Sequence, residues 1–219
     1  MPDWKAHAAR QAERYREGES RLPGLGDEDA RQRQLTRMGN AAGGAGLAHL
    51  MEGDTGTARQ WFDRAAERYR ESFPIAPPES WGRPIGMIKA RLLTGDWPGA
   101  ETDSEWTLEQ GAADADSPIG RYAATLALLV LGRDDDARVL ADGLRTQDGF
   151  PAPVGDALAF IAAQDPIGYI EAIETVLDSF ESREEYLEDI PVADTVIVLQ
   201  ALAARRGMAA DLASELLPT

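Results

Sequence analysis

The chain has 219 residues, a formal net charge of -16 and no cysteine. The missing cysteines exclude disulfides, zinc-thiolate sites and thiol catalysis, and 38 acidic against 22 basic residues would repel nucleic acid and anionic membranes. A chain of this length buries a large core, so we expect a single domain over residues 1–219. The N-terminal stretch MPDWKAHAARQAERYR has no apolar run that would direct export, and the best apolar run, residues 123–131, is too short to span a bilayer. We therefore expect a cytoplasmic protein.

The excess of acidic residues also bears on the salt environment in which the protein works. Only Lys5 and Lys89 are lysine, the other basic residues are arginine, and acidic residues are spread along the whole chain. This pattern favours a halophilic protein, because a solvated acidic surface keeps proteins soluble and monomeric in salt. A GC-rich genome that favours arginine codons is the alternative.

Apolar residues recur at spacings of three and four along the chain, and runs with a period of two are missing, so the sequence predicts an all-α protein. Glycine and proline stand between the periodic segments, where they start and stop helices. A join rich in proline, residues 74–84, is the candidate hinge. The predicted helices are 4–19, 28–51, 55–72, 84–93, 97–110, 118–131, 134–146, 153–163, 166–180, 192–205 and a short 209–216.

Three helix ends share one pattern of residues. At Gly53, Gly95 and Gly132 a helix should close, because glycine adopts the left-handed conformation without a Cβ penalty. An aspartate that can cap the next helix follows at Asp54, at Asp96 and at Asp134 or Asp135. An alanine stands five residues after each glycine, at positions 58, 100 and 137, where a small side chain lets the second helix approach the first. The repeated pattern predicts antiparallel helical hairpins at spacings of about 40 residues.

The first of these hairpins resembles the tetratricopeptide-like family of helical repeats. Gly46, the turn at Gly53, Ala58, Phe62 and Ala65 match the small-and-large pattern of that family. The later hairpins depart from it, since they carry Ser104 and Ala141 at the position of Phe62. The resemblance implies a tetratricopeptide-like superhelix of about five antiparallel hairpins whose concave face binds another macromolecule.

The C-terminal part, residues 186–218, carries a second resemblance. Its apolar helix 196–202, the Ala203-Ala204 pair, Arg206-Gly207 and the final Leu217-Pro218 resemble the tail of immunity protein family 49 of bacterial polymorphic toxin systems. This resemblance implies a protein that binds and neutralises a toxin encoded by a neighbouring gene and catalyses no reaction.

Patterns for catalysis, metals or cofactors are weak. His7 and His49 are the two histidines, and neither lies in a His-Glu-x-x-His motif. The stretch GNAAGGAG, residues 39–46, lacks the Gly-Lys-Ser/Thr of a phosphate-binding loop, so we interpret it as a helix with a small-residue face. Acidic pairs such as Glu171 with Glu174 are interpreted as a solvated surface. The sequence predicts no enzyme, no metal and no cofactor, although a buried polar cluster would favour a hydrolase.

Six residues are candidates for partner binding. Trp81, Trp97 and Tyr186 lie near predicted joins, where aromatic residues often anchor interfaces. A simpler interpretation of Trp97 is that it packs back on Leu93 and closes its hairpin. Arg64, Arg68 and Arg91 could receive carboxylates in the alternative function, a general adaptor that recognises peptide tails. We expect a protein partner and neither nucleic acid nor membrane.

Overall fold

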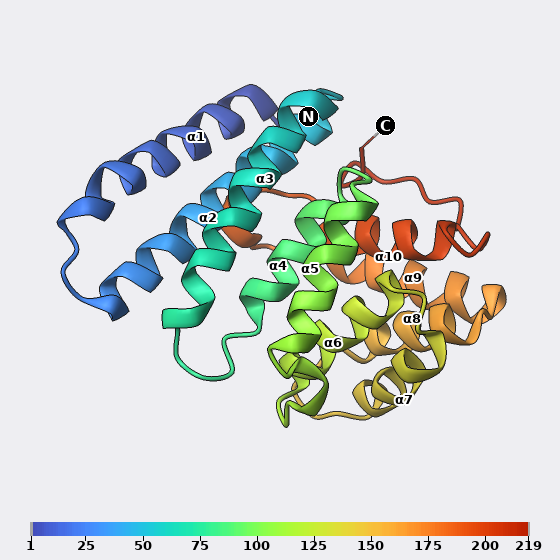
Figure 1. The fold of residues 1–219 in the computed structure, drawn as a ribbon. Coiled ribbons are helices and arrows are strands. Elements are labelled where there is room, and N and C mark those ends of the chain that lie inside the picture. Colours follow the sequence, from blue (N-terminus) through green and yellow to red (C-terminus); the bar gives the residue numbers. More distant parts are fainter. Residues whose placement is uncertain (1, 219) are drawn as a thin grey trace.

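The computed structural model describes residues 2–218, and these residues form ten α-helices and no strand (Figure 1). The all-α class is confirmed. The helices are α1 (Trp4–Arg21), α2 (Glu28–Met51), α3 (Thr55–Ser72), α4 (Gly82–Leu92), α5 (Trp97–Glu109), α6 (Pro118–Val130), α7 (Asp134–Arg145), α8 (Ala152–Ala163), α9 (Pro166–Glu181) and α10 (Asp194–Ala204). None of them is both long and apolar enough to cross a bilayer.

From α1 to α9, each helix packs against the next one in the chain, as expected for a helical-repeat fold (Figure 1). The predicted turns explain this order. Gly53, Gly95 and Gly132 have φ angles of 77°, 66° and 70°, which closes each helix in the left-handed region. The three alanines that follow them, at positions 58, 100 and 137, are fully buried where the helices meet.

The capping prediction holds at two of the three turns. Asp54 accepts a hydrogen bond from the Thr57 amide at 3.0 Å, and Asp96 accepts one from the Gly99 amide at 3.3 Å. At the third turn the prediction is wrong, because Arg133 occupies the N-cap position of α7 and makes no side-chain cap. Asp134 instead pairs with Arg206, which comes from beyond α10. Burial would raise the pKa of Asp134, but hydrogen bonds from Arg206 and Gln164 hold it below its ordinary value.

The glycines of α2 form the close-packing face that the sequence predicted. A Cβ atom built on Gly46 would lie 2.9 Å from the ring of Phe62, and one on Gly39 would lie 2.7 Å from the ring of Tyr69. Both aromatic residues belong to α3. Small residues therefore bring α2 and α3 close enough for aromatic rings to rest on the helix backbone.

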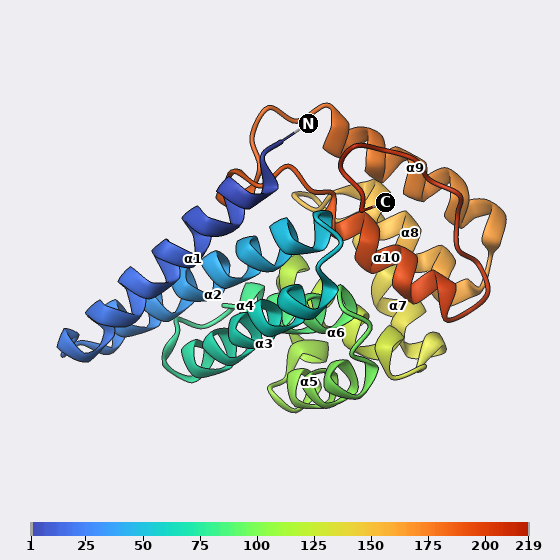
Figure 2. The same cartoon turned by 90° about the horizontal axis from the view of Figure 1, so that it is seen from above.

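The C-terminal part leaves the stacked order. After α9, residues 183–193, which we call the strap, reach back to α1 and α2, and α10 then packs against α4, α8 and α9 (Figure 2). The predicted helix 209–216 is wrong, because this stretch is not helical. Its backbone bonds to other elements instead: the Ala210 amide and carbonyl both bond to the side chain of Gln200, and the Leu216 carbonyl accepts from the Ala193 amide.

The candidate hinge, residues 74–84, contains the end of a short 3₁₀ helix, η2 (Phe73–Ile75), and the first turn of α4. Trp81 of this join packs on Phe73, with ring centroids 5.5 Å apart. A hinge motion at this place stays a prediction.

Gln164 ends α8 in a left-handed conformation, with φ 53° and ψ 41°, which is unfavourable for a residue with a Cβ atom. We expect Gln164→Gly to raise the free energy of unfolding by about 0.5 kcal/mol, since glycine removes this strain while an exposed hydrogen bond to Asp134 is lost. Urea unfolding followed by circular dichroism measures the change. A clear loss of stability would show that the Asp134 contact outweighs the backbone strain.

Candidate binding pocket

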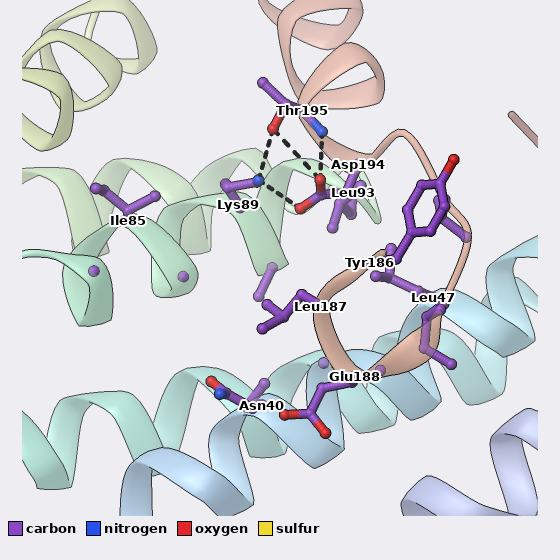
Figure 3. A pocket seen from close by; sticks show the side chains of 18 of the residues that line it. Asn40, Leu47, Ile85, Lys89, Leu93, Tyr186, Leu187, Glu188, Asp194 and Thr195 are labelled. Carbon is purple, nitrogen blue, oxygen red and sulfur yellow. Dashed lines mark hydrogen bonds and ion pairs between the residues drawn. The ribbon is translucent and has the colours of Figure 1, made fainter. Parts of the chain in front are cut away.

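A cavity of about 540 Å³ lies between α2, α3, α4 and the strap, and residues of α6, α8, α9 and α10 also line it (Figure 3). We call it the central pocket. Most of its lining is apolar, and volumes of this order are typical of small-molecule sites. Apolar residues that line it include Leu47, Phe62, Ile85, Leu93, Ile119, Phe150 and Val154.

The strap forms one side of the central pocket. The Glu188 carbonyl accepts a hydrogen bond from the buried side chain of Gln11 at 2.8 Å, and the Glu188 carboxylate pairs with Arg14. The Tyr186 hydroxyl donates to the Phe180 carbonyl at 2.6 Å. Leu187, between them, lines the pocket yet is 73% exposed. Contacts with α1 and α9 therefore hold the strap in place and leave an apolar side chain at the pocket edge.

The backbone of the strap is strained. Glu188 and Asp189 have φ angles of 58° and 57°, in the region that favours glycine. Each such residue costs on the order of 1 kcal/mol. The hydrogen bond from Gln11 and the ion pair with Arg14 offset this cost. The strap is thus held in this shape by α1 and not by its own backbone preference.

An ion pair lies where α4 meets the start of α10, directly after the strap. The Lys89 Nζ atom lies 2.5 Å from Asp194 Oδ2 and donates to the Thr195 hydroxyl at 3.1 Å (Figure 3). Burial alone would lower the pKa of Lys89, but the charge of Asp194, with Tyr122 and the hydrogen bond to Asp194, raises it above its ordinary value. Lys89 therefore stays protonated and acts as a hydrogen-bond donor, because a nucleophile would need the neutral amine.

Two further polar groups line the same pocket. The Tyr69 hydroxyl donates to the Asn40 side chain at 2.8 Å. The Tyr122 hydroxyl is buried and has no hydrogen-bond partner in residues 2–218. Burial raises the pKa of both tyrosines, that of Tyr69 also through nearby acidic residues, so both hydroxyls stay protonated at neutral pH.

Arg83, near the start of α4, is a half-buried cation at the edge of the pocket. Its Nε atom donates to the Ser72 hydroxyl at 2.7 Å, and its Nη2 atom donates to the Gln32 side chain. Both acceptors are neutral, and no carboxylate of the described residues forms a salt bridge with this guanidinium. Burial lowers the pKa of Arg83, and Tyr69 opposes this shift.

Of the aromatic residues proposed from the sequence, one lines the central pocket. Tyr186 lies in the strap, half-buried. Trp81 is 6% exposed and donates from its indole Nε1 atom to Glu79. Trp97 packs against the hydrophobic core, and the Arg205 guanidinium carbon lies 4.5 Å from the centroid of the Trp97 ring. The structure does not bring these three side chains together.

The three proposed arginines lie outside the central pocket. Arg64 stacks on Trp61 at 4.4 Å, and Arg68 donates to the Tyr15 hydroxyl at 3.0 Å; both line a separate hollow between α1 and α3. Arg91 bonds to three carboxylates, which belong to Asp63, Asp96 and Asp103. Internal contacts therefore hold Arg68 and Arg91, and an aromatic ring holds Arg64.

Apart from Tyr186, the polar residues of the central pocket were missed from the sequence. They include Arg83, Lys89, Asp194 and Thr195. One signal was present, because Lys89 is one of only two lysines in a chain that otherwise uses arginine. The others carry no distinguishing pattern.

No protein-family model matches this sequence, and comparison with curated proteins and with solved structures gives no match either. No family match thus supports the resemblance of the C-terminal part to immunity proteins.

Proposed function

We propose that this chain is a non-catalytic, protein-binding helical-repeat protein, and that it acts as an immunity protein that binds and neutralises a toxin encoded by a neighbouring gene. The resemblance of residues 186–218 to immunity proteins supports the specific role. Stacked helical hairpins support the general role, because such folds present extended surfaces that side chains can specialise for a partner.

One observation carries the protein-binding proposal. The strap, an irregular segment with one short 3₁₀ turn, η4 (Leu187–Asp189), lies against α2 and forms one side of a largely apolar pocket. This arrangement supports a partner segment that turns apolar side chains toward the pocket. Leu187, exposed at the edge, is the residue from which we expect contact with a partner to begin.

The alternative is a general adaptor that recognises the carboxylates of peptide tails. That function would need arginines free to bind them. Arg91 is engaged by three acidic residues of its own chain, and Arg68 pairs with Glu71 at 2.7 Å. These contacts occupy the arginines that the adaptor would need, so they favour the immunity protein as the first proposal.

The test begins with a pull-down from the native host at the salt concentration of that host, followed by co-expression of the captured protein with this chain. We expect a stoichiometric partner from the neighbouring gene that is toxic alone and harmless when co-expressed. Recovery of many unrelated chains with a shared terminal motif would favour the adaptor. A neighbouring gene product that is not toxic, or is not neutralised, would contradict the immunity role.

A matched pair of variants then tests the surface. Leu187→Glu places a charge at the pocket edge and should weaken partner binding about tenfold, the loss typical of an apolar interface contact. Val139→Glu on α7 is the control, because Val139 is also 73% exposed but does not line the pocket. Calorimetric titration with the captured partner measures both. Equal affinity of the two variants would show that the partner binds elsewhere.

A further inference from the structure

We propose that the central pocket binds a small organic monocarboxylate with an apolar body, and that Arg83 binds its carboxylate. This inference goes beyond the proposed function, since it concerns a small ligand and not the protein partner. It stands on the charge, the hydrogen bonding and the lining of the pocket.

The charges that line the pocket differ from those of the whole chain. The protein carries a net charge of -16, but the pocket is lined by three cations and two carboxylates. Both carboxylates are already paired, Asp194 with Lys89 and Glu188 with Arg14, which lies outside the lining. Two guanidiniums, Arg83 and Arg183, line the pocket without a paired carboxylate among residues 2–218. The pocket therefore favours an anion on a protein that otherwise repels anions.

Arg83 is the better placed of the two guanidiniums. Arg183 is exposed and stacks on the ring of Phe180 at 3.7 Å. Arg83 is half-buried, and its hydrogen bonds to Ser72 and Gln32 fix the plane of its guanidinium while the Nη1 atom has no acceptor in the described part of the chain. A fixed guanidinium with free N–H groups matches the geometry of a carboxylate.

A partly buried cation without a counter-ion is unfavourable for the folded protein. A bound carboxylate would supply the missing charge and the missing acceptor at once. Ligand binding should for this reason stabilise the folded state as well as occupy the pocket.

The remaining lining defines the rest of the ligand. Phe62, Ile85, Leu93 and Val154 offer an apolar surface, and about 540 Å³ is enough for a small molecule. Arg83 is the one half-buried guanidinium of the lining without a paired carboxylate among residues 2–218, so the pocket offers a counter-charge to a single negative group. A nucleotide or a phosphate ester is therefore a poor fit, and a singly charged acid with an aliphatic chain or ring is a good one.

Purified protein titrated calorimetrically with sodium decanoate, below the concentration at which decanoate forms micelles, tests the proposal. We expect saturable binding of one molecule per chain and a rise in Tm. Decanol, which has the same chain and no charge, should bind at least about tenfold more weakly, because a charge-assisted hydrogen bond is lost. Inorganic phosphate should not compete with decanoate.

Variants assign the site. Arg83→Gln should weaken decanoate binding at least about tenfold, and Arg83→Lys should retain part of the affinity because it keeps the charge without the planar fork. Arg37→Gln is the control, an exposed arginine of α2 outside the pocket lining, and should change affinity less than twofold. Arg183→Gln should also have a small effect.

Three results would overturn the inference: no binding of decanoate, equal affinity for decanoate and decanol, or unchanged affinity in Arg83→Gln. If Arg83→Gln does not fold, the comparison of decanoate with decanol on the unaltered protein still decides whether charge is recognised. Failure here leaves toxin neutralisation unaffected, since that is measured by survival of co-expressing cells and not by ligand titration.

Discussion

Arg91→Met is expected to lower the free energy of unfolding by about 3 kcal/mol, because removing one partner of a buried ion pair leaves an uncompensated charge. The carboxylate at risk is Asp103, whose side chain is 5% exposed and lies 3.0 Å from Arg91 Nε. Arg70 holds its other oxygen at 2.6 Å but is itself 40% exposed. Asp63 and Asp96, which also bond to Arg91, would lose the cation that offsets their mutual repulsion.

The same guanidinium, which belongs to α4, connects three helices, since its partners lie in α3 and at the N-cap and middle of α5. Burial would lower the pKa of Arg91, but the hydrogen bond to Asp103 and the three nearby carboxylates raise it, so its guanidinium stays charged. Arg91 thus acts as a structural cross-link between two hairpins.

Arg138→Met is the matched control for this loss. Arg138 pairs with Asp142 along α7 at 3.8 Å, and both side chains are half exposed or more. Exposed pairs of this kind contribute little, so we expect a change within about 0.5 kcal/mol. Urea unfolding followed by circular dichroism compares the two variants. Similar small losses in both would mean that Arg70 alone compensates Asp103.

Gly86→Ala should destabilise the protein by about 2 kcal/mol, within the range for overpacked cores. A Cβ atom on Gly86 would lie 2.6 Å from the ring of Tyr69. The ring has no room to retreat, since its other edge rests on Gly39, where the corresponding distance is 2.7 Å. Its hydroxyl is also held by Asn40. The ring is therefore fixed from two sides and at its tip.

For Gly43→Ala, the same glycine-to-alanine change, we expect the opposite effect on stability. Gly43 lies within α2, and no atom outside its own helix lies within 4 Å of a Cβ built there. Alanine is the better helix former, so stability should rise by about 0.5–1 kcal/mol. Tm measurements on the two variants check the pair. A gain in both would show that Tyr69 can shift without cost.

The helices could be predicted because their signals are local. The bounds of α2 and α3 follow from Asp27 and Asp54 as caps and Gly53 as the turn, all within a few residues. The stretch 209–216 could not be predicted, because its backbone bonds to residues outside the stretch, Gln200 and Ala193, in place of helical partners. At α7, Asp134 is the first helical residue and not the cap, and its carboxylate pairs with Arg206, 72 residues away.

The central pocket could not be predicted from the sequence either, because its residues come together only in the fold. Its lining comes from segments spread between residues 36 and 195, and even the segment that contributes most, α4 with the residue after it, supplies only part of the wall. Arg83 is a candidate anion-binding residue because both of its hydrogen-bond acceptors are neutral. That depends on which residues surround it in the fold, and the sequence does not show it. Position near a join predicts an exposed aromatic residue, but Trp81 is buried in the structure.

The bond between Gln11 and the Glu188 carbonyl joins positions 177 residues apart and has a consequence for how the chain folds. In an open array of repeats, each unit depends on its neighbours only, and unfolding can proceed from one end. Here the strap links the first helix to the last, so the loss of either end removes contacts from the other. The protein should unfold as one cooperative unit, and during synthesis the α1–α2 hairpin should gain its full protection from hydrogen exchange only after the strap has left the ribosome.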